Sequence, residues 1–387
     1  MLKQNKILFL IVFCQFCCTS LWFAGNSIAT DLIEVFSLSA DFLSTLTSVV
    51  QLGFIVGTLL FAFLNISDRF EATHVFFVCA LVGSILNAFL LFDFNTVRTL
   101  LAIRFFVGVS LAGIYPVGIK IAASHFSKGL GKYLGFLVGA LVLGTAFPHM
   151  LNGFALGVSW KLVLVLTSLI SLLGGFLILC VPTVKVTAPL SRIDIRLLFN
   201  VFRKKAFRNA AYGYFGHMWE LYTFWAFVPS MLMLYQQRHD YLFTNLSLLS
   251  FAIIGIGALS CVWGGFLSLS FGLRKTAFYT LLMSACCCLL FPLFCLYASP
   301  AIYVLFLFFW SAVVIADSPL FSSLLAQSSL AKERGTALTI VNCIGFSITI
   351  LSIYSITYLQ AYMHLWSFMF LAIGPFFGLY FLTQKKV

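Results

Sequence analysis

Long apolar stretches alternate along this chain with short polar gaps, and most basic residues fall in every second gap. Of the 23 Lys and Arg residues, 18 lie in these alternate gaps, whereas the other gaps hold three basic and five acidic residues. Lys and Arg resist transfer across a membrane, so basic gaps mark the cytoplasmic side of a membrane protein. The pattern therefore predicts a multi-pass membrane protein with a fixed orientation.

The apolar stretches predict twelve membrane-spanning helices. About 20 apolar residues, rising about 1.5 Å each, cross about 30 Å of hydrocarbon. The predicted spans cover residues 7–29, 42–65, 73–93, 98–122, 132–157, 160–182, 210–234, 242–270, 276–297, 301–326, 335–359 and 364–382. Basic gaps precede the first span and follow the last, so we expect both termini in the cytoplasm. The compact loops favour the plasma membrane of a bacterium, its inner membrane.

The composition excludes several function classes. The chain is 62% hydrophobic and 9% charged, with a mean hydropathy of +1.07, which leaves no room for a soluble catalytic domain. It carries no ATP-cradling glycine loop, no zinc spacing and no hydrolase motif, so we expect no enzyme, cofactor or metal. The net charge of +12 is scattered over short loops and does not indicate nucleic-acid binding. The eleven cysteines all lie in apolar spans and are interpreted as packing residues.

The longest polar stretch separates two halves of six spans each. The predicted organisation is an N-terminal six-helix bundle, a basic cytoplasmic linker and a C-terminal six-helix bundle, at residues 1–182, 183–209 and 210–387. Three sequence features recur at an offset of 203 or 204 residues, namely Pro116 and Pro319, Gly131 and Gly335, and Trp22 and Trp225. A common offset indicates duplicated halves, and an even number of spans per half makes the repeats parallel.

In this topology the chain resembles the major facilitator superfamily over essentially its whole length. Between spans 2 and 3 the family pattern is Gly-x-x-x-Asp-Arg-x-Gly-Arg-Arg, of which this sequence keeps Asp68-Arg69. Span 4 carries the family's Arg-x-x-x-Gly pattern as Arg104 and Gly108, whereas the proton-antiport signature of span 5 is not reproduced. The resemblance implies an all-α integral membrane protein with 12 transmembrane helices in two parallel six-helix repeats. It also implies a gating role for Asp68 and Arg69, against the alternative of a plain cytoplasmic turn.

Four of the charged residues inside the predicted spans stand out, and each costs at least about 2.5 kcal/mol there unless it faces a cavity or a partner. They are Arg104, Lys120, Glu220 and Asp317. Glu220 lies about ten residues into its span, which places it near the bilayer midplane. His217 precedes it by three residues and shares its helix face. We interpret Glu220 and His217 as proton-coupling residues; a permanent helix lock between Glu220 and Arg104 or His217 is the alternative.

Asp317 lies nearer the cytoplasmic end of span 10, directly before Ser318 and Pro319. We group it with the proton-coupling residues as a cavity-facing acid at a hinge. The alternative is an ion pair with Lys332 or Arg334. Lys120 is close enough to the cytoplasmic end to reach the membrane surface.

Arg104 is the candidate for holding an anionic group of a solute. Neutral polar and aromatic residues in the spans are further candidates for substrate binding, although such residues often only join neighbouring helices. These candidates are Asn26, Gln51, Tyr115, Asn152, Tyr222, Trp225 and Asn342.

These patterns predict a secondary active transporter that works by alternating access, with proton symport of a small polar or anionic solute. Proton-coupled efflux of amphipathic, drug-like compounds is one alternative, and a transporter-like membrane sensor is another. The expected partners are the solute, protons and the lipid bilayer, with no nucleic acid. We expect the protein to be a monomer.

Overall fold

The computed structural model describes residues 2–39, 41–92, 95–126, 130–154, 159–184, 201–330 and 334–384, and all regular structure in these ranges is helical. The chain divides into two compact units, Met1–Ile193 and Asp194–Val387. Residues 185–200 of the predicted linker lie outside the described residues. The linker therefore stays a prediction, and each unit is described by itself.

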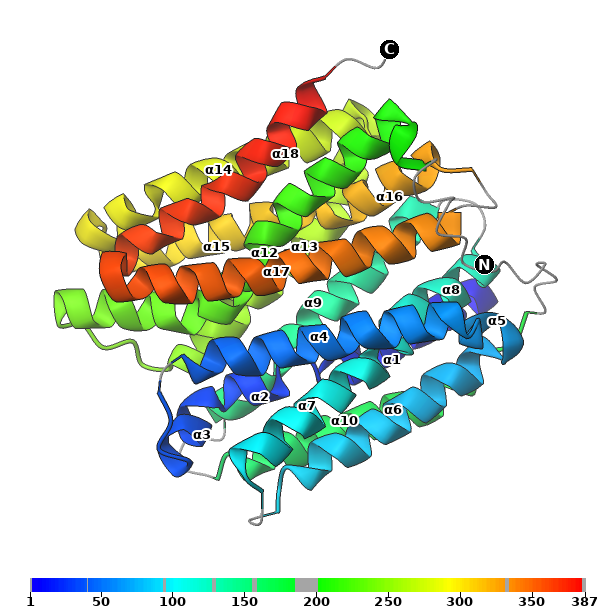
Figure 1. Cartoon of the computed structure of the whole chain (residues 1–387), viewed down its shortest axis with the longest axis horizontal. Coiled ribbons are helices and arrows are strands. Elements are labelled where there is room, and N and C mark those ends of the chain that lie inside the picture. Colours follow the sequence, from blue (N-terminus) through cyan, green and yellow to red (C-terminus); the bar gives the residue numbers. More distant parts are fainter. Residues whose placement is uncertain are drawn as a thin grey trace. The chain divides into compact units, whose positions relative to one another are not determined.

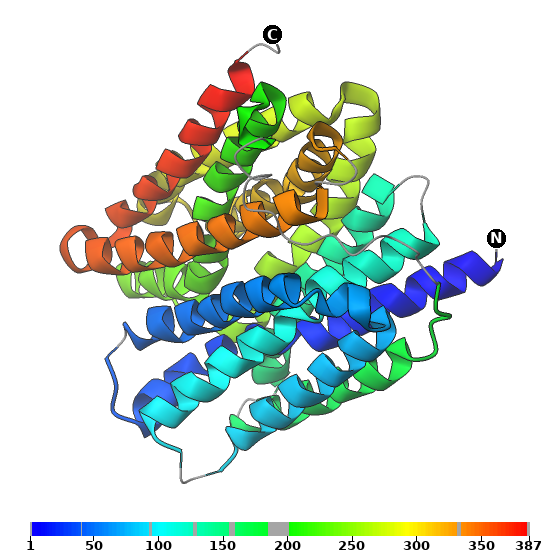
Figure 2. The same ribbon diagram turned by 45° about the vertical axis from the view of Figure 1, so that its right-hand side comes forward.

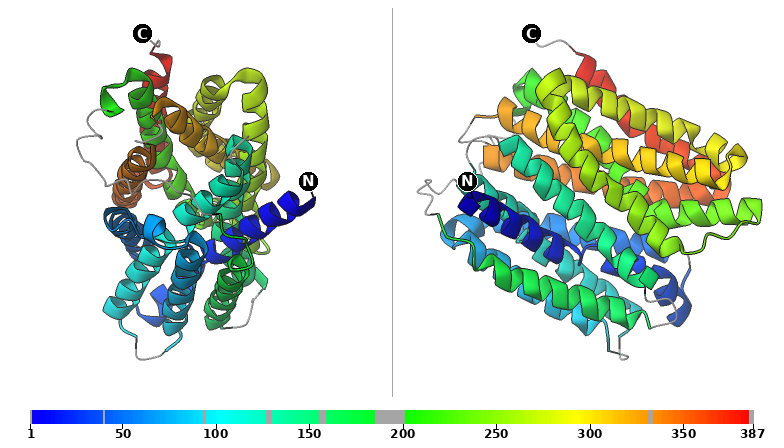
Figure 3. Two further views of the ribbon diagram at one scale, coloured as in Figure 1. Left: turned by 90° about the vertical axis from the view of Figure 1, so that its right-hand side faces the viewer. Right: turned by 180° about the vertical axis from the view of Figure 1, so that it is seen from behind.

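The N-terminal unit is a helical bundle (Figure 1). In it, α4 packs against α7, α6 packs against α7 and α10, and α1 packs against α9 and α10 (Figures 2 and 3). Its helices are α1 (Leu2–Thr19), α2 (Ala24–Ser27), α3 (Ala29–Val35), α4 (Phe42–Phe63), α5 (Ile66–Arg69), α6 (Ala72–Phe89), α7 (Val97–Ala112), α8 (Tyr115–His125), α9 (Leu130–Phe154) and α10 (Lys161–Ile178).

The C-terminal unit is built in the same way. Here α12 packs against α17 and α18, α13 against α15, and α14 against α15 and the 3₁₀ segment η1. Its elements are α12 (Lys205–His239), α13 (Leu246–Phe271), α14 (Leu273–Tyr297), α15 (Pro300–Ala316), α16 (Ser318–Ser328), α17 (Arg334–Met363), η1 (His364–Ala372) and α18 (Ile373–Thr383).

Nine segments of the described residues are long and apolar enough to cross a membrane. They are Phe42–Phe63, Ala72–Phe89, Val97–His125, Tyr133–Phe154, Lys161–Ile178, Leu246–Phe271, Leu273–Tyr297, Pro300–Ser328 and Gly335–Thr383. The last has 49 residues and contains two predicted spans, whereas the apolar helix Gln4–Thr19 is shorter than the others. The 35-residue helix α12 is not among the nine, because polar residues such as His217 and Glu220 lower its hydropathy.

Three spans predicted as continuous helices are interrupted, which corrects the sequence-based expectation. The first breaks between Thr19 and Ala24, where the Thr19 and Ser20 hydroxyls bond to the carbonyls of Gln15 and Cys17 (2.8 and 2.7 Å). Such local bonds compete with the helical backbone pattern. The fourth span breaks between α7 and α8 and the tenth between α15 and α16. In both cases the duplicated proline, Pro116 or Pro319, stands in the first turn of the new helix, where its missing N–H is tolerated.

Glycines permit a close helix contact in the N-terminal unit. A Cβ atom on Gly53 of α4 would lie 1.9 Å from the Phe105 carbonyl oxygen, and one on Gly108 of α7 would lie 2.1 Å from that of Val50. The two backbones therefore touch, as small residues permit in membrane helices. Gly108 of the Arg-x-x-x-Gly pattern has a packing role, and it fixes the position of Arg104 one turn earlier.

Candidate functional site

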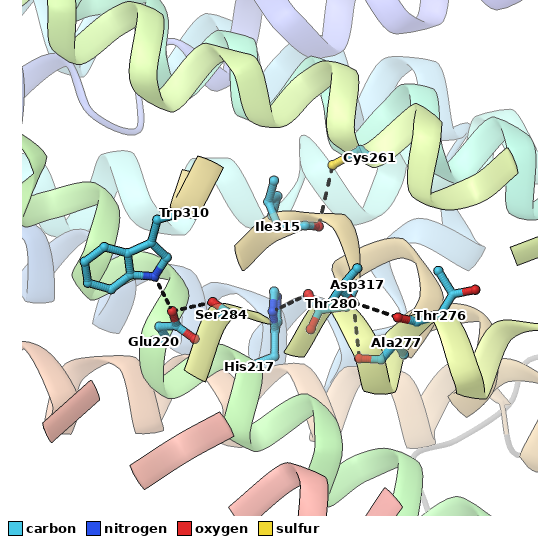
Figure 4. A network of polar contacts seen from close by, with 10 residues as sticks. All are labelled: His217, Glu220, Cys261, Thr276, Ala277, Thr280, Ser284, Trp310, Ile315 and Asp317. Carbon is cyan, nitrogen blue, oxygen red and sulfur yellow. Dashed lines mark hydrogen bonds and ion pairs between the residues drawn. The ribbon is translucent and has the colours of Figure 1, made fainter. Parts of the chain in front are cut away.

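The buried charges of the C-terminal unit gather around α12. His217 and Glu220 are three residues apart on this helix, and their exposed fractions are 1% and 0%. Asp317, at the break between α15 and α16, is 1% exposed. Figure 4 shows the three side chains in the same region, with one set of polar contacts at Glu220 and another between His217 and Asp317. The structure thus brings together the three residues that the sequence assigned to proton coupling.

Three side chains donate hydrogen bonds to one oxygen of Glu220. Ser284 Oγ and Cys288 Sγ, one turn apart on α14, lie 2.5 and 3.2 Å from Oε1. Trp310 Nε1 on α15 lies 2.6 Å from the same atom. The other oxygen, Oε2, is buried and has no hydrogen-bond partner among the described residues. Hydrogen bonds to a charged acceptor are stronger than neutral ones, so Oε1 is well stabilised while Oε2 is left open.

The three donors to Glu220 are not among the residues predicted from the sequence. Ser284 and Cys288 lie in an apolar, cysteine-rich stretch, and the sequence predicts a packing role for its cysteines. The available signal was their spacing of four residues, which places both on one helix face. Trp310 offered no such signal, because its distance in sequence from Glu220 is 90 residues.

His217 faces Asp317 and does not bond to Glu220. Its Nδ1 lies 2.8 Å from Oδ1 of Asp317, with both side chains buried. Its other ring nitrogen, Nε2, has no hydrogen-bond partner among the described residues, nor has Oδ2 of Asp317. The predicted alternative for Asp317, an ion pair with Lys332 or Arg334, falls on side chains outside the described part. The contact found instead joins α12 to the break after α15.

Arg104 contacts the break in the first span. Its Nη1 donates to the carbonyl of Leu21 at 3.0 Å and to Asn87 Oδ1 at 3.4 Å, and its Nη2 donates to the carbonyl of Trp22 at 2.6 Å. The side chain is fully buried, and Nε has no hydrogen-bond partner within the described ranges. Arg104 therefore satisfies carbonyls that the interrupted helix leaves without N–H partners. This arrangement ties α7 to the end of α1 and leaves one donor unused.

Two of the neutral candidates join helices of the N-terminal unit. Asn26 Nδ2 donates to Thr47 Oγ1 at 2.6 Å, and Asn152 Nδ2 donates to the Ser27 carbonyl at 2.7 Å. These bonds connect α2 to α4 and to α9. Asn26 thus lies on α2, and Asn152 contacts it. This short helix directly follows Leu21 and Trp22, whose carbonyls Arg104 contacts.

The remaining substrate-binding candidates are spread over both units. Tyr222 and Trp225 are buried on α12, with ring centroids 5.2 Å apart, and Tyr222 also contacts Phe346 of α17. Gln51 is buried on α4. Tyr115 and Asn342 are half-buried, on α8 and α17. Their role in binding stays a prediction.

The predicted gating pair lies at the short helix α5. Arg69 is exposed at its last position, and the side chain of Asp68 lies outside what the structure describes. The gating role therefore stays a prediction. Elsewhere, the described residues contain no group of three or more His, Cys, Asp or Glu side chains placed to hold a metal ion, and all eleven cysteines are free.

Comparison with known proteins places this architecture among transporters. The sequence model of the Major Facilitator Superfamily matches residues 8–353, and no curated protein matches the chain. A crystal structure of the human organic anion transporter MFSD10 (TETRAN) has a TM-score of 0.72 at 14% identity, over 98% of both chains. A bacterial homologue of the human lysosomal transporter Spinster, inward-facing and unoccupied, has a TM-score of 0.67 at 14% identity, over 98% of this chain and 94% of that one. At this identity the likeness shows the fold, and the predicted all-α membrane architecture is confirmed.

Proposed function

The chain belongs to the Major Facilitator Superfamily of secondary transporters, and on this premise we propose that it couples proton entry to uptake of a small polar or anionic solute. In this proposal the two halves alternate between inward-open and outward-open states. The protein resides as a monomer in a plasma membrane, the inner membrane of a bacterium, with both termini in the cytoplasm.

The observation that carries the proposal is the environment of Glu220. Its carboxyl group is fully buried, accepts three hydrogen bonds on Oε1 and forms no ion pair with any described Lys or Arg. A charged carboxylate inside a membrane is costly without a cation, and uptake of a proton removes that cost. Since Oε2 has no partner, it is the atom that accepts the proton. The three donors stabilise the carboxylate after release, so both forms are accessible in one transport cycle.

The pair of His217 and Asp317 serves as the second proton station. Asp317 fixes the orientation of the imidazole through Nδ1, which leaves Nε2 as the atom that exchanges a proton. Glu220 lies about one turn further along α12. Asp317 also sits where α15 passes into α16, so a change in its charge acts directly on the break. Protonation and helix movement are thereby linked through one contact.

The solute class follows from the buried cation of the N-terminal unit. Arg104 has no acidic partner among the described side chains and retains an unused donor at Nε. An anionic group would neutralise that charge. The human structure with the same fold is named an organic anion transporter, which supports an anionic solute. Symport is preferred over efflux because the antiport signature is missing from span 5.

The test is proton movement in proteoliposomes that contain the purified protein. Small organic anions are compared with neutral and cationic amphiphiles as solutes. We expect organic anions to drive proton uptake, and we expect Glu220→Gln to abolish it. Glu71→Gln is the matched control, because Glu71 is a half-exposed acid that pairs with His74 at the membrane surface. Solute uptake without proton flux, unchanged in Glu220→Gln, would contradict proton coupling.

A further inference from the structure

A small pocket lies in the C-terminal unit where four helices have their ends. The helices α12 and α14 begin there, whereas α16 and α18 end there. Its volume is about 220 Å³, and its lining includes Ala206, Asn209, Arg274, Gln327, Ser328 and Leu382. Neither Glu220 nor the pair of His217 and Asp317 lines it. The pocket is therefore separate from the proposed proton site, and helix ends place it at the level of the lipid headgroups.

Arg274 supplies the positive charge of the pocket. Its Nε and Nη2 donate to the carbonyl of Leu382, and Nη2 also donates to that of Gln384. These are carbonyls that the last turn of α18 leaves without helical partners. Carbonyls are neutral, and no described carboxylate pairs with Arg274, so its charge is not compensated. Among the described residues Nη1 makes no hydrogen bond, which leaves one edge of the guanidinium available.

Asn209 supplies an unused acceptor beside this charge. The side chain is 6% exposed, and its Nδ2 donates to the carbonyl of Gln384 at 3.4 Å. Its Oδ1 is buried without a hydrogen-bond partner in the described part of the chain. A buried polar atom without a partner is costly, so it favours a ligand that brings a donor. The exposed amide of Gln327 adds a further polar group at the rim.

The size of the pocket limits what can occupy it. Drug-sized ligands occupy pockets of about 300–1,000 Å³, and one water occupies about 30 Å³. At about 220 Å³ the pocket is too small for such ligands but large enough for a phosphate group with a few attached atoms. The small side chain of Ala206 leaves this space open beside the polar lining residues Asn209, Arg274, Gln327 and Ser328.

We propose that this pocket binds a phosphate ester that carries a neighbouring hydroxyl group. The phosphate contacts Arg274, and the hydroxyl donates to Oδ1 of Asn209. Basic pockets between membrane helices commonly bind anionic lipid headgroups. A phosphatidylglycerol headgroup has both groups, and so has soluble glycerol 3-phosphate. The ligand bridges α12 and α14 to the end of α18, which Arg274 and Asn209 already contact.

The experiment measures lipid binding to the purified full-length protein by native mass spectrometry. Phosphatidylglycerol is titrated against phosphatidylcholine, which lacks the hydroxyl groups and the net negative charge. Arg274→Gln should weaken phosphatidylglycerol binding by about tenfold or more, as expected for loss of a charge-assisted hydrogen bond. Ala206→Leu fills the pocket without touching the bonds from Arg274 to α18, and it should weaken binding to a similar extent. It keeps the test valid if Arg274→Gln destabilises the fold.

Lys275→Gln is the matched control, because Lys275 is an exposed neighbour that carries the same charge and does not line the pocket. It should change binding by about twofold at most. Equal losses in Lys275→Gln and Arg274→Gln, or equal binding of phosphatidylcholine, would overturn the proposal. Binding of glycerol 3-phosphate alone, with the same dependence on Arg274 and Ala206, would support the site and identify a soluble source. Glu220→Gln should leave binding unchanged, which separates this site from the proposed transport function.

Discussion

Two buried charges in this protein have different surroundings, and this difference separates their roles. Arg104 is held by backbone carbonyls at a helix break, whereas Glu220 is held by side-chain donors on neighbouring helices. Removing Arg104 would leave structural acceptors buried without partners. Neutralising Glu220, by a proton or as glutamine, keeps an oxygen that can still accept from the surrounding donors. We therefore expect substitutions of Arg104 to affect stability, and those of Glu220 and its partners to affect the pH dependence of transport.

Arg104→Gln should lower the free energy of unfolding by about 3 kcal/mol, because the carbonyls of Leu21 and Trp22 lose their donors. Thermal unfolding of the purified protein measures the effect. The control is Arg98→Gln, an exposed arginine at the start of the same helix, which should change stability by less than about 0.5 kcal/mol. A raised KM for solute with unchanged stability would assign Arg104 to solute binding alone.

Trp310→Phe should shift the pH dependence of proton-coupled transport towards higher pH by roughly one unit. The indole donates to the carboxylate of Glu220, so its loss makes the charged form less stable, and the proton is released only at higher pH. Transport rates measured across a pH series test this expectation. Trp263→Phe, at an exposed tryptophan of α13, should leave the profile in place. An opposite or absent shift in Trp310→Phe would show that this hydrogen bond does not control proton release from Glu220.

At the scale of helices, the sequence predicts where the spans lie better than where they break. Hydropathy depends only on the composition of a segment. Since both halves of an interrupted span are apolar, hydropathy does not reveal the break between them. The breaks depend on local competition from Thr19 and Ser20 and on prolines, whose effect on a helix depends on the position at which they stand. Glu220, His217 and Asp317 could be singled out from the sequence because titratable residues in apolar spans are rare; their role in proton coupling stays a prediction. The donors to Glu220 could not be singled out, since their role depends on packing between α12, α14 and α15.

The contact between α4 and α7 gives a test at this scale. Gly53→Ala should prevent normal packing, because the added Cβ would lie 1.9 Å from a backbone oxygen that cannot move independently of its helix. We expect strongly reduced recovery of folded protein, measured by size-exclusion chromatography after solubilisation. Gly265→Ala is the matched control, as its Cβ would meet nothing within 4 Å. That change should keep or raise stability, by up to about 1 kcal/mol, because alanine favours a helix. Normal recovery of Gly53→Ala would exclude the close backbone contact.

At the scale of the whole molecule, coupled transport requires that the halves alternate either with a proton on Glu220 and solute bound, or after both have left. In the proposed cycle the carrier returns without solute only after its proton has left Glu220. The fold alone does not determine this coupling, because proteins with one fold carry out many functions. In our proposal the coupling depends on Glu220 and the pair of His217 and Asp317, all buried in the C-terminal unit. Net uptake of solute therefore requires that Glu220 release its proton, whereas exchange of external for internal solute does not.

Glu220→Gln should separate these two processes. Glutamine resembles the protonated, neutral acid, so the loaded protein can still alternate and exchange external solute for internal solute. Net accumulation against a gradient needs release of the proton, and this step is lost. We expect exchange of labelled solute to remain within about tenfold of the wild-type rate, while accumulation driven by a pH gradient disappears. Loss of exchange together with accumulation, in a variant of unchanged thermal stability, would show that Glu220 is needed for alternation or solute binding and not for the proton alone.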